Sequence, residues 1–264
     1  MHGLLVGAWR YRFFIYSSIK TELQLRFIRS RLGGLWMVLN PLFQVLIFVF
    51  VLSSVMAAKL PGIKSEFAYA IYLMSGMLFW SLFSEILNRA TNIFIENGNL
   101  LKKISFPKIA LPLIMVGSAL FNNILLLISM IFIFGFLGHW PGVSIIALPI
   151  LIVITVAFAL GIGLILGVLN VFMRDIGQVM PVILQIVYWF TPIVYVASML
   201  PENYQHMINY NPFTPIAMSY QDVLLYGKFP NWVDLGVVAT AAFLLLALSL
   251  YLFRKASAEM VDQL

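Results

Sequence analysis

Six long apolar runs constrain the fold of this 264-residue chain more than any other feature of its sequence. They comprise residues 35–57, 67–87, 111–137, 143–172, 179–196 and 232–253. A bilayer-spanning helix needs about 20 apolar residues, so each run can cross a membrane, the fifth only just. None shows the alternation of a membrane β-barrel strand. Because a spanning segment must satisfy its own backbone hydrogen bonds, we expect an all-α integral membrane protein with six transmembrane helices.

The composition agrees with this class. Hydrophobic residues make up 62% of the chain and charged residues only 10%, whereas a soluble domain is about half apolar and a quarter charged. The absence of cysteine excludes disulfides, zinc–thiolate sites and iron–sulfur clusters. A multi-pass protein acquires a net charge such as +6 from basic cytoplasmic loops. We therefore expect membrane lipid, and no nucleic acid, as a partner.

The distribution of Lys and Arg predicts the orientation. With the N-terminus inside, only Lys59, Lys64 and Lys228 of the 16 basic residues fall outside. Basic residues collect on the cytoplasmic side, so we expect both termini in the cytoplasm. The first run is too long for a signal-peptide core and no small-residue cleavage site follows it, so it is expected to remain a span.

Two segments outside the runs are expected to touch the membrane without crossing it. Residues 1–34 place Trp9, Phe13, Tyr16, Leu23 and Phe27 near one helical face, interrupted by Lys20, which predicts a cytoplasmic interfacial helix. A plain cytosolic linker is the alternative. Residues 198–231 are too broken by Pro and Gly to span, yet too apolar for a soluble loop. They predict a re-entrant helical hairpin, a periplasmic gate between spans five and six. The whole chain, 1–264, is expected to form one transmembrane domain, with its six-span bundle over 35–254.

The sequence offers no chemistry for ion coupling, nucleotide binding or catalysis. No ionisable residue is expected in the middle of a span, which disfavours a proton- or sodium-driven carrier. Glu85 and Arg89 are expected to form an i,i+4 ion pair at the inner end of span two. No phosphate-binding loop motif occurs, no metal site or catalytic group is apparent, and Gly163 and Gly167 predict close helix packing. The chain is therefore expected to be a transport subunit rather than an enzyme.

A short basic segment separates the second and third runs and is the best candidate for contact with a soluble partner. Asn97-Gly-Asn99 is expected to stop or turn the chain, Leu100 to Lys103 to form one amphipathic turn, and Phe106-Pro107 to end it. The docking residues are predicted to be Asn97, Asn99, Leu100, Lys102, Lys103, Phe106 and Pro107. An ordinary connecting loop is the alternative.

Aromatic residues are concentrated in the first and fifth runs. Lipid contact is their ordinary role, and the alternative is a pathway in which sugar C–H faces stack on the rings. The candidate pathway residues are Phe43, Phe50, Tyr188 and Tyr195. At 100° per residue, Tyr188 and Tyr195 lie about 20° apart on a helix, whereas Trp189 points about a quarter-turn away from Tyr188.

Several stretches in order along the chain carry a family resemblance. They are RFIRSRLGGLWMVLNPL from Arg26, NLLKKISFP from Asn99, RDI from Arg174, Leu184-Gln185, Trp189, TPIVY from Thr191, Asn211-Pro212, and YQD from Tyr220. Together they resemble the transmembrane subunit of type-two ABC exporters for O-antigen, capsular polysaccharide and teichoic acid. The resemblance implies a homodimer, with a pathway lined by spans one and five. It also implies two copies of a cytosolic ABC ATPase that dock on the 97–107 segment and themselves bind ATP and Mg, with no cofactor in this chain.

The resemblance leads to a functional prediction. We expect the permease subunit of an exporter that moves lipid-linked polysaccharide, with O-antigen as the first candidate, across a bacterial inner membrane. Arg26, Arg29 and Arg31 are expected either to hold the substrate pyrophosphate by bidentate hydrogen bonds or only to fix topology. A permease for a smaller amphiphile or lipo-oligosaccharide is the alternative, followed by a membrane-embedded glycan-modifying enzyme.

Overall fold

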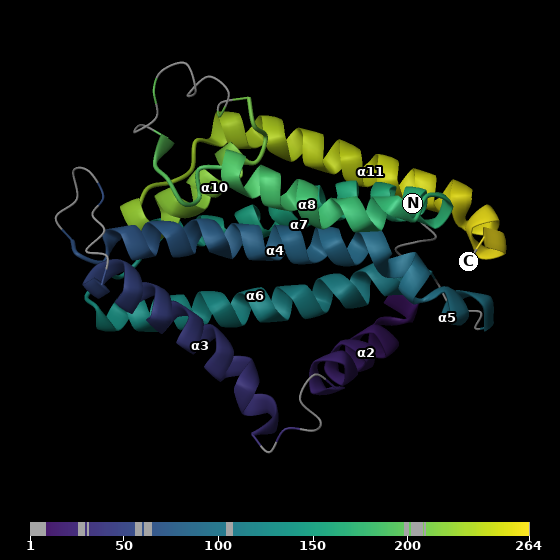
Figure 1. Cartoon of the computed structure of the whole chain (residues 1–264), viewed down its shortest axis with the longest axis horizontal. Coiled ribbons are helices and arrows are strands. Elements are labelled where there is room, and N and C mark those ends of the chain that lie inside the picture. Colours follow the sequence, from purple (N-terminus) through teal and green to yellow (C-terminus); the bar gives the residue numbers. More distant parts are fainter. Residues whose placement is uncertain are drawn as a thin grey trace.

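The computed structural model describes residues 9–25, 30, 32–55, 60, 65–103, 108–197, 201, 208 and 210–263. Throughout these residues the regular structure is helical, which confirms the predicted all-α class. The elements are α2 (Arg12–Leu25), η1 (Gly33–Leu35), α3 (Trp36–Val49), η2 (Phe50–Val55), α4 (Ala68–Glu96), α5 (Gly98–Lys103), α6 (Ala110–Phe136), η3 (Val143–Ala147), α7 (Leu148–Phe172), α8 (Asp175–Phe190), α10 (Thr214–Gln221), η5 (Asp222–Tyr226) and α11 (Trp232–Gln263). Helices α4, α6, α8 and α11 run along the long axis of the molecule (Figure 1).

Five helical segments are long and apolar enough to cross a membrane, with mean hydropathies between 1.5 and 2.9. They are Gly33–Ser53, Ala68–Glu96, Ala110–Phe136, Val143–Phe172 and Trp232–Ala256. These segments match the first four predicted runs and the sixth, so the chain is a multi-pass membrane protein. The fifth run forms α8, an apolar helix of 16 residues. This length is below the roughly 20 residues of a full crossing, so the sixth span stays a prediction.

Helix α7 packs between α4 and α11. On two faces of α7 this close approach depends on glycine, because a Cβ atom there would collide with the neighbouring helix. A Cβ added to Gly161 would meet the α11 backbone at Leu246 N, 2.8 Å away. On the other face, a Cβ on Gly163 would lie 2.6 Å from the Ala90 Cβ of α4, and one on Gly167 would collide with the Ala90 carbonyl. The close packing predicted for the glycine pair is confirmed, because small residues let two backbones approach.

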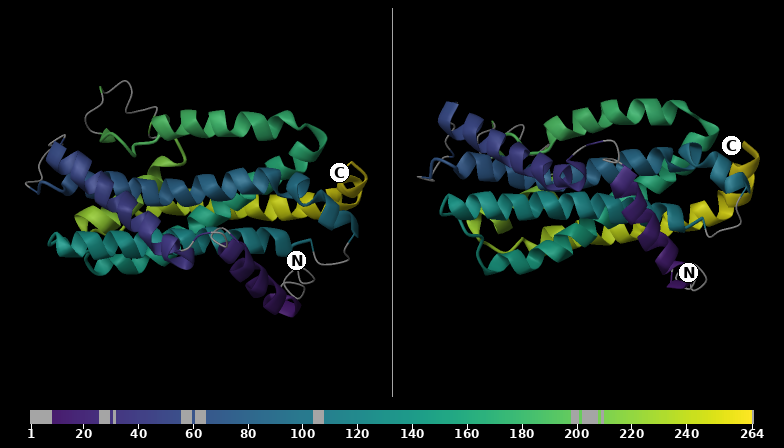
Figure 2. Two further views of the ribbon diagram at one scale, coloured as in Figure 1. Left: turned by 60° about the horizontal axis from the view of Figure 1, so that its bottom comes forward. Right: turned by 90° about the horizontal axis from the view of Figure 1, so that it is seen from below.

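Helix α4 lies at the centre of the fold. In its most apolar stretch 72% of the residues are buried, against 17% in the Gly33–Ser53 segment. Its aromatic side chains join those of neighbouring elements, since the Phe83 ring lies 6.0 Å from that of Phe158 in α7 and 4.9 Å from that of Phe213. The segment containing α3 is therefore peripheral, and Figure 2 shows α3 inclined to the other long helices.

Helix α4 also extends nine residues beyond the predicted end of the second run, residue 87, to Glu96. Glu85 consequently lies eleven residues before the end of the helix, about 17 Å along its axis. The placement of Glu85 at the inner end of span two stays a prediction, because about 20 of the 29 residues of α4 suffice for a crossing. The helix continues through polar sequence because Arg89 is ion-paired and the Asn92 amide donates to the Asn88 carbonyl.

The described part of segment 1–34 contains α2, which packs against α6. Ile19 lies directly over Gly117 of α6, where any side chain would collide with it. Trp9, Phe13 and Tyr16 are between 71% and 72% exposed, so they point away from the bundle. Figure 1 shows α2 inclined to the long helices beside the end of α6. The helix is confirmed over these residues, and its position in the membrane interface stays a prediction.

The described part of segment 198–231 contains α10, which continues directly into the π-helical turn η5. Ile216 and Tyr220 are fully buried. The ring Nε2 of His139 donates to the Leu224 carbonyl at 2.8 Å, and the Ser144 hydroxyl donates to the Val223 carbonyl at 3.1 Å. These bonds attach η5 to the connection between α6 and α7. Whether the segment enters the membrane as a hairpin stays a prediction.

Candidate functional site

The predicted docking segment begins with a turn centred on Asn97. The backbone N–H of Asn97 and its side-chain amide both donate to the Ile93 carbonyl, at 3.2 and 2.8 Å, and so end α4. The Asn97 carbonyl then accepts from the N–H groups of Leu100 and Leu101, each at 3.0 Å, and so starts α5. One residue therefore joins the long helix α4 to the short helix α5, as the Asn-Gly-Asn sequence predicts.

Helix α5 has an apolar and a polar side. Leu101 is buried and Leu100 half-buried, whereas Asn99 and Lys102 are exposed. α5 contacts α4 and α11, and it lies at the opposite end of the molecule from α10 (Figure 1). The side chain of Lys103 and the residues Phe106 and Pro107 lie outside the described residues. The amphipathic turn is confirmed, and its role in docking a partner stays a prediction.

Arg89 connects three helices and lies seven residues before the end of α4, about 10 Å along its axis. Its guanidinium lies 2.7 Å from the Glu22 carboxylate of α2 and 3.4 Å from the Glu85 carboxylate of α4. It also donates to the Ser118 hydroxyl of α6 at 2.8 Å. The expected i,i+4 pair is present, but it is the longest of the three contacts. Because α4 leads directly into α5, this network ties the helix before the predicted docking segment to both α2 and α6.

The three arginines predicted at the substrate entrance, Arg26, Arg29 and Arg31, lie outside the described residues, as does Phe27. They follow α2, in which basic and aromatic groups are interleaved. The Arg12 guanidinium lies 4.9 Å from the Trp9 ring centroid and 4.6 Å from that of Phe13. Such a mixed surface suits the headgroup region of a bilayer.

The predicted pathway residues of α3 and η2 lie on one exposed face. Phe43 is 52% exposed and Phe50 is 63% exposed, whereas Val45 and Val49 are buried against the bundle. Helix α8 likewise buries Met180 and Leu184. The exposed side chains of α8 include Val182, Ile186 and Trp189. Both helices thus present apolar surface that the single chain leaves uncovered.

The structure separates the two predicted tyrosines from their neighbour Trp189. Trp189 is 58% exposed, whereas Tyr188 is half-buried, with its ring centroid 5.4 Å from that of Trp80 in α4. Tyr195 is also half-buried, and its carbonyl lies 3.0 Å from the hydroxyl of Tyr72. Tyr188 therefore contacts α4, and its assignment to the pathway stays a prediction.

The chain after α8 is fixed by hydrogen bonds to its carbonyl groups. The buried amide of Gln221 donates to the Pro192 carbonyl at 2.9 Å. The Tyr72 hydroxyl lies 3.1 Å from the same carbonyl, and the Tyr69 hydroxyl donates to the Val194 carbonyl at 2.6 Å. Gln221 is thereby a structural residue that joins the end of α10 to the end of α8.

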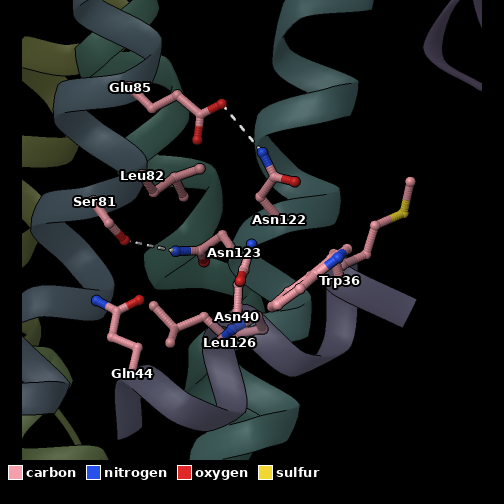
Figure 3. Close-up of a pocket in the computed structure, with 11 residues that line it drawn as sticks. Trp36, Asn40, Gln44, Ser81, Leu82, Glu85, Asn122, Asn123 and Leu126 are labelled. Atoms are coloured by element: carbon pink, nitrogen blue, oxygen red, sulfur yellow. Dashed lines mark hydrogen bonds between the residues drawn. The ribbon is translucent and has the colours of Figure 1, made fainter. Parts of the chain in front are cut away.

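A polar cavity of about 250 Å³ lies between α3, α4 and α6. Its polar lining comes from Asn40 and Gln44 of α3, Ser81 and Glu85 of α4, and Asn122 and Asn123 of α6. Figure 3 shows these side chains converging from the three helices, with Trp36 on the α3 side. The Asn123 amide donates to the Leu78 carbonyl at 2.8 Å. Among the described residues, the Oδ1 of Asn123 has no hydrogen-bond partner.

A second cavity, of about 690 Å³, lies between α10, η5 and the start of α11. Asp222, Asp234 and Asn231 supply much of its polar lining. Burial raises the pKa of the Asp222 carboxyl above its ordinary value, and the nearby Lys228 ammonium opposes that rise. The Asn231 amide donates to Asp234 at 2.6 Å. Over the described part of the chain, no three His, Asp or Glu side chains come close enough together to hold a metal ion.

Reasoning from the sequence missed the cavity between α3, α4 and α6. A signal was present, because Asn40 and Gln44 lie four residues apart in one apolar run, and Asn122 and Asn123 interrupt another. Residues four apart share a helix face, and amide side chains within a span need polar partners. What the sequence could not supply is which helices face one another.

Comparison with known proteins covers nearly the whole chain. A profile of the ABC-2 type transporter family matches residues 14–225. An O-antigen export system permease protein RfbA of Klebsiella pneumoniae is 28% identical over 237 residues, which cover 89% of this chain and 88% of the relative. A protein of the same name from Myxococcus xanthus is 26% identical over 266 residues, covering 100% of both chains. The polysialic acid transport protein KpsM of Escherichia coli is 23% identical over 239 residues, covering 88% of this chain and 89% of the relative.

The family match includes most of the elements described above, from α2 through α10 and most of η5. It agrees with the apolar helices of the structure and with the resemblance of the ordered sequence motifs. Because the matched region is far more than half of its length, the chain belongs to the ABC-2 type transporter family.

Proposed function

We propose that this protein is the permease subunit of an ATP-driven exporter that moves lipid-linked polysaccharide, with O-antigen as the first candidate, across a bacterial inner membrane. The observation that carries the proposal is the end-to-end similarity to a relative named as an O-antigen export permease, 26% identical over 100% of both chains. Similarity to a polysialic acid transport protein extends over 88% of this chain. Glycan transport is thus what the names of these relatives have in common.

In this proposal α8 is the fifth of six spans. A 16-residue helix covers about 24 Å, and the buried to half-buried chain through residue 196 extends its apolar length. The interfacial helix α2 and the two termini lie on the cytoplasmic side, and segment 198–231 forms the periplasmic gate. The support is the charge distribution, which leaves only Lys59, Lys64 and Lys228 outside.

The permease works as a homodimer in this proposal. The support is the uncovered apolar surface of α3, η2 and α8, where Phe43, Phe50 and Trp189 are more than half exposed. Two such surfaces facing each other would enclose a pathway with aromatic walls. A large exposed apolar face in a single chain is the usual mark of contact with lipid or another subunit.

Energy would come from two copies of a cytosolic ABC ATPase, which hold ATP and Mg and dock on α5. The support is the short amphipathic helix α5, with exposed Lys102 and buried Leu101, at one end of the bundle. Movement of α5 passes directly to α4, because Asn97 joins them, and from Arg89 to α2 and α6. In this mechanism, ATP-driven closure of the ATPases opens the pathway between the two permease chains.

Deletion of the coding gene in its own bacterium tests the proposal. Surface polysaccharide should disappear, and the lipid-linked glycan should accumulate in the inner membrane, as measured by gel electrophoresis of surface glycan and mass spectrometry of the lipid fraction. Re-expression of the wild-type chain should restore both. Unchanged surface polysaccharide, with loss of a smaller exported amphiphile instead, would contradict glycan export and favour the alternative substrate class.

A further inference from the structure

The polar cavity between α3, α4 and α6 is not accounted for by docking, by dimer contact or by an aromatic pathway. It lies halfway along α4 and α6, where most surrounding side chains are apolar. Polar side chains at this depth in a membrane protein are energetically unfavourable unless they are paired, and they usually mark a functional site. Asn40 is exposed and Gln44 half-buried, so the α3 side of the cavity is accessible.

One residue of the cavity wall, Asn123, contains a polar atom without a hydrogen-bond partner among the described residues. Asn123 is only 4% exposed and lines the cavity, yet its Oδ1 has no partner among the described residues. A buried carbonyl oxygen without a partner costs about 1–3 kcal/mol. Its other amide atom is already used, since Nδ2 donates to the Leu78 carbonyl at 2.8 Å. Because the Oδ1 atom is itself buried, Asn123 marks a polar part of the cavity wall, and a ligand would pair with the more accessible amides of α3 and α6.

The charges around the cavity narrow the chemical class of ligand. The described side chains that line it include one carboxylate, Glu85, and neither Lys nor Arg. A phosphate group would therefore lie beside the Glu85 carboxylate with no Lys or Arg in the cavity wall to pair with it. A cationic headgroup would have to compete with Arg89, which lies 3.4 Å from Glu85. A neutral ligand suits the cavity best.

The remaining lining suits a ligand with many hydroxyl groups. The carboxamides of Asn40 and Gln44 each carry donors and an acceptor, and a sugar hydroxyl can pair with either. The Asn122 amide donates to the Glu85 carboxylate at 3.3 Å (Figure 3), so a ligand would pair with its second N–H or its carbonyl oxygen. Trp36, at the α3 side, offers an apolar ring face for the C–H side of a sugar. The volume of about 250 Å³ holds about eight water molecules, enough for one sugar ring but not for a chain.

We propose that the cavity between α3, α4 and α6 binds one neutral sugar ring of the exported glycan, through the amides of Asn40, Gln44 and Asn122. This inference rests on the proposed function for the identity of the substrate. The site lies on the α4 and α6 side of α3, behind the exposed face that carries Phe43 and Phe50. Occupation of the cavity places a sugar between α3 and two of the helices that Arg89 connects, α4 and α6. Sugar binding would therefore act on α4, the helix that leads into α5.

The experiment measures saturation-transfer difference NMR on the purified full chain with its partner ATPase. The probes are free glucose, galactose, mannose, rhamnose and N-acetylglucosamine. At least one should give a signal with the wild type. That signal should fall at least fivefold in the double variant Asn40→Leu with Gln44→Leu. The matched control is Gln24→Leu, which changes an exposed carboxamide of α2 outside the cavity and should keep the wild-type signal.

A smaller change covers the case in which the double variant does not fold. Gln44→Ala removes one amide without adding bulk and should lower the signal at least twofold. Equal signals in the wild type and in the folded variants overturn the proposal and leave a hydrated structural cavity. Displacement of the sugar by inorganic pyrophosphate overturns it in favour of an anion site. Loss of a bound phosphatidylethanolamine from the double variant in native mass spectrometry overturns it in favour of a lipid headgroup.

The outcome is separable from that of the gene deletion. If deletion abolishes surface glycan while the variants bind sugar as the wild type does, the inference fails and the proposed function stands. If sugar binding depends on Asn40 and Gln44 while surface glycan survives deletion, the cavity is a sugar site in a protein with another task.

Discussion

At the scale of single residues, Gly167 illustrates how a missing side chain determines the fold. A Cβ at this position would collide with the Ala90 carbonyl of α4, and backbone atoms cannot move away as a flexible side chain can. Gly167→Ala should therefore destabilise the protein by about 1–3 kcal/mol, the usual penalty of overpacking. Thermal unfolding in detergent measures the change.

The matched control is Gly236→Ala, also within a long helix, where an added Cβ would meet nothing within 4 Å. Alanine is the better helix former, so this variant should be neutral or slightly more stable. An equal loss of stability in both variants would contradict the packing account.

The ion pair of Glu22 with Arg89 leads to a second prediction at this scale. The Glu22 carboxylate lies 2.7 Å from Arg89, and both side chains are 29% exposed. Glu22→Gln keeps the shape but replaces a charge-assisted hydrogen bond with a neutral one, which is roughly half as strong. Unfolding should become easier by about 1 kcal/mol, and export should fall. Glu66→Gln, an exposed carboxylate in the turn before α4, should change neither. Equal behaviour of the two variants would remove the α2–α4 link from the mechanism.

Some of these residue contacts could be predicted from the sequence and others could not. The Gly163–Gly167 spacing was sufficient to predict a close helix contact, because the requirement is local. The Glu85–Arg89 pair was also local, but the shorter contact to Glu22 joins residues 67 positions apart. The polar cavity likewise forms only where polar side chains of α3, α4 and α6 lie at the same level along the bundle. No periodicity within one run specifies which side chain of another run it will meet.

At the scale of elements, α5 is where coupling to a partner is expected. Replacing Lys102, Lys103 and Phe106 by Ala should abolish export while the permease remains in the membrane, because the docking surface would lose its charge and its aromatic group. Surface polysaccharide and co-purification of the ATPase are the two measurements. Lys20→Ala, an exposed lysine of α2, is the control and should leave both unchanged. Normal export and normal co-purification in the triple variant would show that the ATPase docks elsewhere.

Cysteine labelling can identify which face of α8 lines the pathway, because the chain has no cysteine of its own. Single cysteines at positions 188, 189 and 195 should be tested with a water-soluble thiol reagent in an ATP-trapped state. The pathway proposal predicts labelling at 188 and 195 and protection by the exported glycan. Labelling at 189 alone would instead assign the pathway to the exposed face that carries Trp189.

Helix positions followed well from the apolar runs, whereas helix lengths did not. The runs located every long apolar helix in the described part of the chain, because apolar length is a local property. They underestimated α4, which continues to Glu96 because its polar residues find partners on α2 and α6. They overestimated α8, which ends at Phe190, where Thr191 adopts an extended backbone. Tertiary contacts thus extend α4, and the break before Pro192 ends α8, so neither helix ends where hydropathy alone predicts.

At the scale of the whole molecule, the amphipathic helix α5, where docking is predicted, lies at one end, and the short buried helix α10 lies at the other (Figure 1). Between them α4 is the central element, since it leads into α5, packs on α7 and α10, and shares a polar cavity with α3 and α6. The uncovered apolar surface of α3 and α8 leaves room for a second copy. The central claim is that this assembly uses a partner's ATP hydrolysis to carry a lipid-linked glycan across the membrane.

Reconstitution into proteoliposomes tests that claim most directly. The permease and its ATPase are placed in vesicles whose outer leaflet carries lipid-linked glycan, and glycan that resists an external glycosidase is measured with time. The account predicts that protected glycan accumulates only when both proteins and hydrolysable ATP are present, and not with a non-hydrolysable analogue. Accumulation that is independent of ATP, or no accumulation with the complete and folded complex, would contradict it.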